Sequence, residues 1–189
     1  SILTGLLPPA HGVRDNGSYA LGPAAVTIAA RLKEAGWATH AVVSALVLDR
    51  RYGLDQGFDS YDDDLWSEDA PRLFLIRDRP ARRTADRFLA WLDGRAAQAR
   101  TTPFFAWVHF FDPHQPYEPE AQDRPLAPTP YDAEITGADR ALGRILDRLR
   151  QHRLLDDTVV VVTADHGESL GEHGEKTHAV FVYDATVKV

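Results

Sequence analysis

Hydrophobic and polar positions change period along the chain, and the changes predict helices alternating with strands. Residues 23–35 are predicted to form a helix, because Pro23 suits a first turn and Gly36 suits a C-terminal cap. Residues 37–45, rich in Val and Ala, are predicted to form the strand that follows. Residues 46–67 show no regular pattern, so we expect an irregular segment whose aspartates are solvated rather than bound to calcium.

The same alternation continues to the end of the chain. Residues 83–99 carry apolar side chains on one helical face, and residues 104–111 form a continuous aromatic run typical of a buried strand. Residues 118–129 are a proline-rich loop, after which Pro130 is predicted to open a long helix with helical apolar spacing. Residues 158–162 read as a second buried strand. This order predicts an α/β fold, a mostly parallel sheet with helices on both faces.

Composition places the chain among ordinary globular proteins. The hydrophobic content is 44% and the charged content 26%, and 189 residues are enough for a real core. The net charge of −7 argues against a nucleic-acid surface. No apolar run is long enough to span a membrane, and no signal peptide is visible. With no cysteine, the chain contains no disulfide, no thiolate zinc site and no cysteine nucleophile.

The two ends of the chain give a further expectation. There is no methionine, even at position 1, and the last residues before Val189 form an apolar run. We expect residues 1–189 to be one partial domain, an internal piece of a longer protein. Cellular compartment and oligomeric state stay open.

Candidate metal ligands follow the predicted strand 158–162. Asp165 and His166 come where the backbone begins to turn, and Gly167 allows the close approach of a ligand. Carboxylate and imidazole groups at the carboxyl end of a buried strand suit a divalent metal. The alternative is a purely structural role, with Asp165 capping a following helix and His166 exposed to solvent.

Further candidates surround this pair in the sequence. His114 stands between two prolines after the aromatic strand, where the same sheet edge would place it near Asp165. Lys176 and His178 are candidates for neutralising an anionic ester, with surface positions as the alternative. His109 is expected to be a core histidine with its hydrogen bonds satisfied. The glutamates at 168, 172 and 175 are either partners that orient histidines or solvent-facing charges.

Three blocks of the chain resemble the sulfatase family of the alkaline-phosphatase superfamily. Residues 1–14 resemble the segment that follows the family's nucleophile motif, and residues 111–117 resemble its central histidine motif. Residues 163–184 resemble its C-terminal metal motif. The blocks stand in the family's order and cover essentially the whole chain. The resemblance implies an alkaline-phosphatase-like fold.

The resemblance also implies roles for individual residues. Asp165 and His166 would be two ligands of one divalent metal, Ca²⁺ in the first place, with Mn²⁺, Mg²⁺ and Zn²⁺ open. His114 and His178 would contact the sulfate or phosphate oxygens, and Lys176 shares the cationic role with His178. Asn16 would lie near the nucleophile and the transferred group; without the resemblance, Asn-Gly there reads only as a turn.

Two parts of the family pattern are missing from this sequence. The paired metal-binding aspartates and the nucleophile with its arginine do not occur in it, and would precede Ser1. The implied activity is hydrolysis of a small-molecule or glycan sulfate ester by the longer protein, with residues 1–189 alone inactive. The alternatives are a phosphodiesterase, phosphoglycerol transferase or phosphonate monoester hydrolase of the same fold, or a binding domain without catalysis.

Overall fold

Two compact units, Ser1–Asp156 and Asp157–Val189, make up the chain in a computed structural model. The structure describes residues 1–65, 78–178 and 181–189. Within these ranges, every helix is too short or too polar to cross a membrane. The two units are considered one at a time.

The first unit is built on a parallel sheet. In the described residues, β1 (Ala38–Val42) lies between β2 (Ser60–Asp62) and β3 (Phe104–Val108). Because both neighbours run parallel to β1, the carboxyl ends of all three strands meet at one edge of the sheet. In α/β sheets this is the edge where ligands bind.

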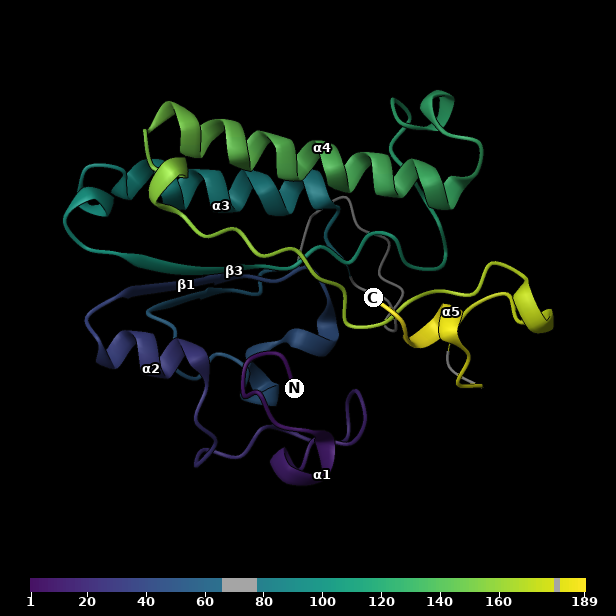
Figure 1. Ribbon diagram of the computed structural model, residues 1–189, viewed down its shortest axis with the longest axis horizontal. Helices are drawn as coiled ribbons and strands as arrows, with labels where there is room; N and C mark the ends of the chain where they lie inside the picture. Colours follow the sequence, from purple (N-terminus) through teal and green to yellow (C-terminus); the bar gives the residue numbers. More distant parts are fainter. Residues whose placement is uncertain (66–77, 179–180) are drawn as a thin grey trace. The chain divides into compact units, whose positions relative to one another are not determined.

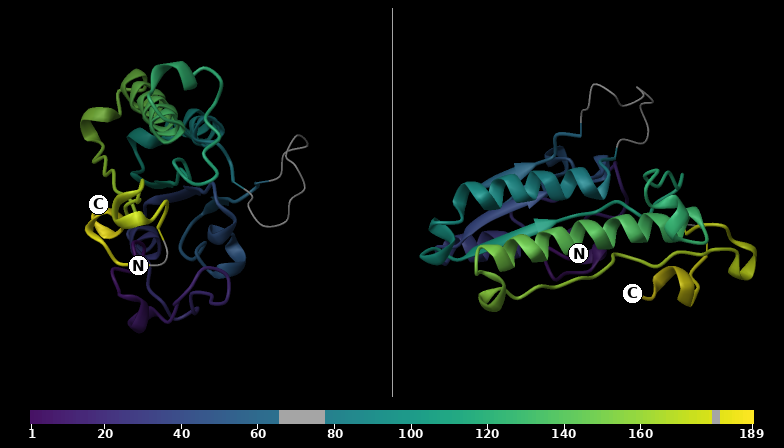
Figure 2. Two further views of the ribbon diagram at one scale, coloured as in Figure 1. Left: turned by 90° about the vertical axis from the view of Figure 1, so that its right-hand side faces the viewer. Right: turned by 90° about the horizontal axis from the view of Figure 1, so that it is seen from above.

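Helices cover both faces of this sheet, as the sequence predicted (Figures 1 and 2). α3 (Ala81–Arg95) and α4 (Pro130–Gln151) lie side by side on one face, and α2 (Ile28–Glu34) lies on the other. On the α3 and α4 side the buried cluster is Val42, Ala81, Ala85, Phe88, Leu89, Leu92, Ala141, Ile145, Leu149 and Leu154. On the α2 side it is Leu3, Ala29, Ala41, Val43, Phe58 and Tyr61.

The long helix α4 begins at Pro130, where the sequence predicted it. The Thr129 hydroxyl accepts a hydrogen bond from the Asp132 backbone, which satisfies one of the free amides of the first turn. The helix predicted over 83–99 is α3, which begins two residues earlier and ends at Arg95. The helix predicted from Pro23 begins only at Ile28, because the Thr27 hydroxyl caps it by accepting from the Ala30 backbone.

Two predicted strands and the predicted irregular segment of the first unit need correction. The strand predicted over 37–45 is β1 and is shorter, and the strand predicted over 104–111 ends at Val108. β3 is also only half-buried, since it is an edge strand of the described sheet and has one strand neighbour. Residues 60–62, predicted to be irregular, form β2 by pairing with β1. Residues 66 and 67 of that predicted irregular segment lie outside the described residues.

The second unit contains a short helix, α5 (Asp184–Val187), and the first unit contains another, α1 (Pro8–His11). The buried strand predicted over 158–162 is wrong: the structure has no strand there, and Val159 and Val161 are 89% and 79% exposed. Among the described residues of 157–189 there is no other strand to pair with it, and a lone strand leaves its backbone groups unsatisfied.

Short 3₁₀ helices complete the described structure, at Leu46–Leu48, Arg50–Tyr52, Gln98–Arg100, Arg124–Leu126, Leu155–Asp157 and Glu172–Gly174. The aspartates around the second of these are not simply solvated. Arg50 donates to both carboxylate oxygens of Asp63, and Arg51 pairs with Asp49. The ion pair with Arg50 outweighs partial burial and holds the pKa of the Asp63 carboxyl below its usual range.

Candidate functional site

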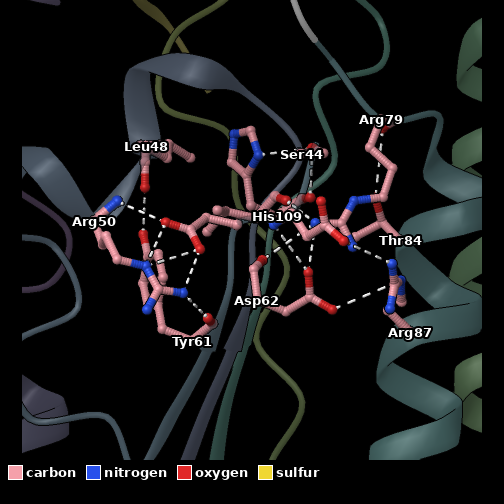
Figure 3. A network of polar contacts seen from close by, with 12 residues as sticks. Ser44, Leu48, Arg50, Tyr61, Asp62, Arg79, Thr84, Arg87 and His109 are labelled. Atoms are coloured by element: carbon pink, nitrogen blue, oxygen red, sulfur yellow. Dashed lines mark hydrogen bonds and ion pairs between the residues drawn. The ribbon is translucent and has the colours of Figure 1, made fainter. Parts of the chain in front are cut away.

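Polar side chains tie together the carboxyl edge of the sheet in the first unit (Figure 3). The Ser44 hydroxyl donates to the His109 carbonyl at 2.7 Å and lies 2.9 Å from His109 Nδ1. Arg79, which is 5% exposed, donates to the Val43 carbonyl and to the Asp62 carboxylate. The prediction that His109 is a core histidine is therefore wrong in its burial, because His109 is half-buried and follows the end of β3, although its Nδ1 and its carbonyl do have a partner in Ser44. These bonds hold the residues that follow β1 and β3 together at the carboxyl edge of the sheet, just before the loop at residues 112–118.

His114 lies in the loop that follows β3, at residues 112–118. Its ring stacks on Phe111, with 4.0 Å between ring centroids, and its Nδ1 lies 2.7 Å from the Gln115 carbonyl. Because a carbonyl only accepts, Nδ1 carries the hydrogen. The Asp112–Pro113 and Gln115–Pro116 peptide bonds are both cis. The ring is therefore held by stacking and by a local hydrogen bond.

Two carboxyl groups, the half-buried Asp112 and the buried Glu134, join this loop to the helices. Asp112 accepts from the Ala81 backbone at 2.8 Å, at the beginning of α3, and burial raises its pKa to about 6. Glu134 of α4 accepts from the His114 backbone at 3.1 Å and from the Glu118 backbone at 2.6 Å. Burial raises the pKa of Glu134 to about 7, although these two bonds oppose the rise.

The second unit holds the predicted metal ligands next to each other. Asp165 Oδ2 lies 3.7 Å from His166 Nε2, and both residues are exposed. His166 Nδ1 contacts the Gly167 carbonyl at 2.7 Å, which fixes the hydrogen on that nitrogen and leaves Nε2 with a free lone pair, as a metal ligand would need. Gly167 is needed here because a Cβ would meet the Ala185 carbonyl at 2.1 Å.

His178 belongs to the same local group. Its ring centroid lies 4.2 Å from that of His166. The Glu168 carboxylate accepts from the His178 backbone at 2.6 Å and contacts the ring Nδ1 at 3.2 Å through both oxygens. Burial opposes ionisation of Glu168, but these bonds prevail and keep the pKa of the carboxyl below its usual range. The second unit thus brings Asp165, His166, Glu168 and His178 together.

The structure does not bring the other predicted residues into either group. Asn16 is exposed in the turn after α1, where the Ser18 backbone donates to Asp15. Lys176 is exposed. The roles of Asn16 and Lys176 stay predictions. The proximity of His114 to Asp165, which lie in different units, also stays a prediction.

Glu134 is the residue that the sequence reasoning missed. A signal for it exists in the pattern of α4, because it stands on the apolar stripe formed with Ala138, Ala141 and Ile145. A charged side chain at a core position of an amphipathic helix calls for a partner. The backbone amides of His114 and Glu118 are the partners of the Glu134 carboxylate.

Comparison with known proteins places the chain in one family. A family model described as Sulfatase matches residues 1–183. The endo-4-O-sulfatase of Bacteroides thetaiotaomicron is 35% identical over 95 residues, covering 36% of this chain and 19% of that protein. The phosphonate monoester hydrolase of Silicibacter pomeroyi matches with a TM-score of 0.68 and 21% identity, covering 98% of this chain and 55% of its own.

A protein solved in complex with its substrate D-glucosamine-2-N,6-O-disulfate matches with a TM-score of 0.71 and 16% identity. The match covers 99% of this chain and 58% of that one. At 21% and 16% identity, the matches to the Silicibacter pomeroyi hydrolase and to this disulfate complex show a shared fold. The chain spans about half the length of the solved structures it matches, and about a fifth or less of the curated relatives.

Proposed function

Because the chain belongs to the sulfatase family, whose model matches residues 1–183, we propose that the full-length protein hydrolyses sulfate esters. The substrate is a small molecule or a glycan carrying a sulfate ester. In the net reaction water cleaves the ester bond, sulfate leaves with the oxygen of water, and the alcohol oxygen takes up a proton. The family match over both units is the observation that carries this proposal.

The histidines supply the contacts to the sulfate group in this proposal. His114 and His178 each have Nδ1 engaged, by a carbonyl and by a carboxylate respectively. In the imidazolium form, which carries a hydrogen on both ring nitrogens, Nε2 is then the nitrogen that donates to a non-bridging sulfate oxygen or gives a proton to the leaving alcohol. Lys176 shares the cationic role with His178, and Asn16 contacts the transferred group.

A divalent metal is the implied cofactor, and the residues of this chain fit it in part. Two ligands of one cation, bonded at about 2.0–2.5 Å, stand roughly 3–3.5 Å apart. The 3.7 Å between Asp165 Oδ2 and His166 Nε2 is close to that. Among residues 1–65, 78–178 and 181–189, however, no group of three His, Asp or Glu side chains could hold a metal ion. The pair therefore provides part of a coordination shell.

We propose Ca²⁺ as the metal, with Mn²⁺, Mg²⁺ and Zn²⁺ as the competitors to test. Carboxylate oxygen suits Ca²⁺ and Mg²⁺, whereas the imidazole of His166 suits Zn²⁺ and Mn²⁺ as well. When bound, such an ion polarises an ester oxygen and stabilises negative charge.

The test is release of inorganic sulfate by the full-length protein from a panel of aryl, alkyl and glycan sulfate esters, with each metal supplied. Turnover is expected, and His114→Ala and His178→Ala are expected to lower it strongly. The matched control is His152→Ala, which changes a histidine at the end of α4, outside both candidate groups. Absence of sulfate release with every ester and metal contradicts the proposal.

A second candidate function is phosphonate monoester hydrolysis. It is favoured by the fold match to the Silicibacter pomeroyi hydrolase. The same panel therefore includes phosphonate monoesters and phosphodiesters. If kcat/KM is higher for a phosphonate monoester than for every sulfate ester, the second candidate replaces the first.

A further inference from the structure

Glu134 is a carboxylate placed where an apolar side chain would pack. It is 6% exposed and stands beside Ala133, which is 1% exposed. Its helix, α4, is 22 residues long and packs on α3 through Ala141, Ile145 and Leu149. Burying a carboxylate costs free energy unless its oxygens are hydrogen-bonded. The hydrogen bonds made by its two carboxylate oxygens therefore explain why Glu134 can occupy a buried position.

The two oxygens of Glu134 bind the two ends of one short segment. Oε2 accepts from the His114 backbone at 3.1 Å, and Oε1 accepts from the Glu118 backbone at 2.6 Å. The loop is thereby fastened at both ends to a rigid helix. The ring of His114 is then oriented by its stacking on Phe111 and its contact with the Gln115 carbonyl.

Burial disfavours the charged form of the Glu134 carboxyl and raises its pKa. Burial is the largest influence, and the carboxylates of Asp112 and Asp78 add to it, so that the pKa of Glu134 rises to about 7. The other titratable groups of the loop are His114, Tyr117 and Glu118. Arg82, Glu120 and Asp123 line the same cavity as Glu134 and Asp112. Glu134 is therefore partly ionised near pH 7, and carboxyls perturbed in this way cluster at functional sites.

We propose that Glu134 is a positioning residue that fixes His114 for contact with the sulfate group. The inference rests on the proposed function of His114. It adds that Glu134, on the rigid helix α4, holds the backbone of that histidine in position. Glu134 itself does not touch the substrate.

The experiment uses the full-length protein and three variants. Glu134→Ala removes both acceptors. Glu134→Gln keeps one acceptor and turns an amide N–H₂ toward the other backbone N–H. Asp139→Asn is the matched control, since Asp139 is exposed on the same helix. Hydrogen exchange resolved to single amides is measured at His114 and Glu118 between pH 6 and 8, together with kcat/KM for a sulfate ester.

In E134A we expect both amides to exchange roughly 10-fold faster, which corresponds to a hydrogen bond of about 1.4 kcal/mol. In E134Q only one amide does so. When exchange occurs by local opening of the loop with Glu134 still buried, protection of these amides rises with pH through about 7 in the wild type, because ionisation strengthens the two bonds, and it stays flat in both variants. We expect kcat/KM to fall roughly 10–100-fold in E134A, as for other residues that orient a catalytic group, and to be unchanged in D139N.

The outcomes separate the inference from the proposed function. Wild-type turnover with unchanged kcat/KM in E134A overturns the inference and leaves the function standing. If the wild type releases no sulfate from any ester, the proposed function fails and the exchange data alone decide. In that case, faster exchange confined to His114 and Glu118 supports the fastening role. Unchanged exchange at both amides, or equal acceleration along the whole of α4, overturns it.

Discussion

Glu168 holds His178 by its backbone and by its ring at once, so one side chain sets both the position and the tautomer of that histidine. We expect Glu168→Ala to lower kcat/KM for a sulfate ester roughly 10–100-fold, because the freed ring loses its orientation. Steady-state kinetics on the full-length protein measure this. Glu172→Ala is the control, since Glu172 is exposed and accepts from the Leu170 backbone. Equal losses in the two variants contradict the orienting role.

Glu134 also makes the stability of the fold depend on pH. Its pKa in the folded protein is about 7, above the ordinary value of 4.5, because burial disfavours the charged form. The stability it contributes is therefore fully present below about pH 4.5 and is lost as pH rises through about 7. Over that window the loss is at most roughly 3 kcal/mol.

Glu134→Gln cannot titrate and should remove this dependence. Urea unfolding at pH 4.5 and at pH 7.5 is the measurement. We expect the free energy of unfolding of the wild type to fall more steeply over this interval than that of the variant. Asp112, whose burial raises its pKa to about 6, contributes a fall of the same sign to both proteins. Parallel profiles contradict the prediction.

At the scale of elements, Gly57 controls how α2 packs near the sheet. It has a φ of +90°, and a Cβ there would meet the Ala30 backbone nitrogen at 2.1 Å. Gly57→Ala therefore forces the chain away from α2, and we expect a loss of roughly 2–4 kcal/mol in the free energy of unfolding. Denaturant titration measures it.

Gly94 provides the matched control for this change. It is exposed in α3, and a Cβ there would meet no atom within 4 Å. Gly94→Ala is expected to stabilise the protein by roughly 0.5–1 kcal/mol, because alanine loses less conformational entropy in a helix. If Gly57→Ala is as harmless as Gly94→Ala, α2 is not packed against this turn.

The elements differ in how far the sequence predicts them. α3 and α4 are found because their apolar spacing and the proline at position 130 are local signals. β2 is missed because Ser60–Asp62 is polar, and its strand character comes from pairing with β1, more than fifteen residues away. The strand predicted over residues 158–162 is the opposite error, a predicted strand that the structure lacks. β-branched residues favour a strand only where a neighbouring strand pairs with them.

At the scale of the whole molecule, the candidate residues divide between the two units. Asn16, His114 and Glu134 belong to the first, and Asp165, His166 and His178 belong to the second. The sequence identifies most of them because motifs are local. It does not identify Glu134, because that role depends on where a helix meets a loop sixteen or more residues distant.

The division bears on metal affinity, because the second unit offers Asp165 and His166 as one pair of donors. A divalent ion takes at least four ligands, and with two from protein the others must be water. We expect residues 1–189 alone to bind Ca²⁺, Mn²⁺ or Mg²⁺ with a dissociation constant above about 1 mM, weaker than extracellular calcium modules with a full oxygen shell. We also expect no turnover of sulfate esters by residues 1–189 alone.

Calorimetric titration of the 189-residue chain, beside the full-length protein, tests this expectation. Asp165→Ala is introduced in both as the control for specific binding. The full-length protein should bind at least roughly 100-fold more tightly than the short chain, a difference of about 2.7 kcal/mol that additional ligands readily supply. Asp165→Ala should abolish that difference. Micromolar binding by the short chain that disappears in its Asp165→Ala variant contradicts the prediction, since it means that these residues form a complete site.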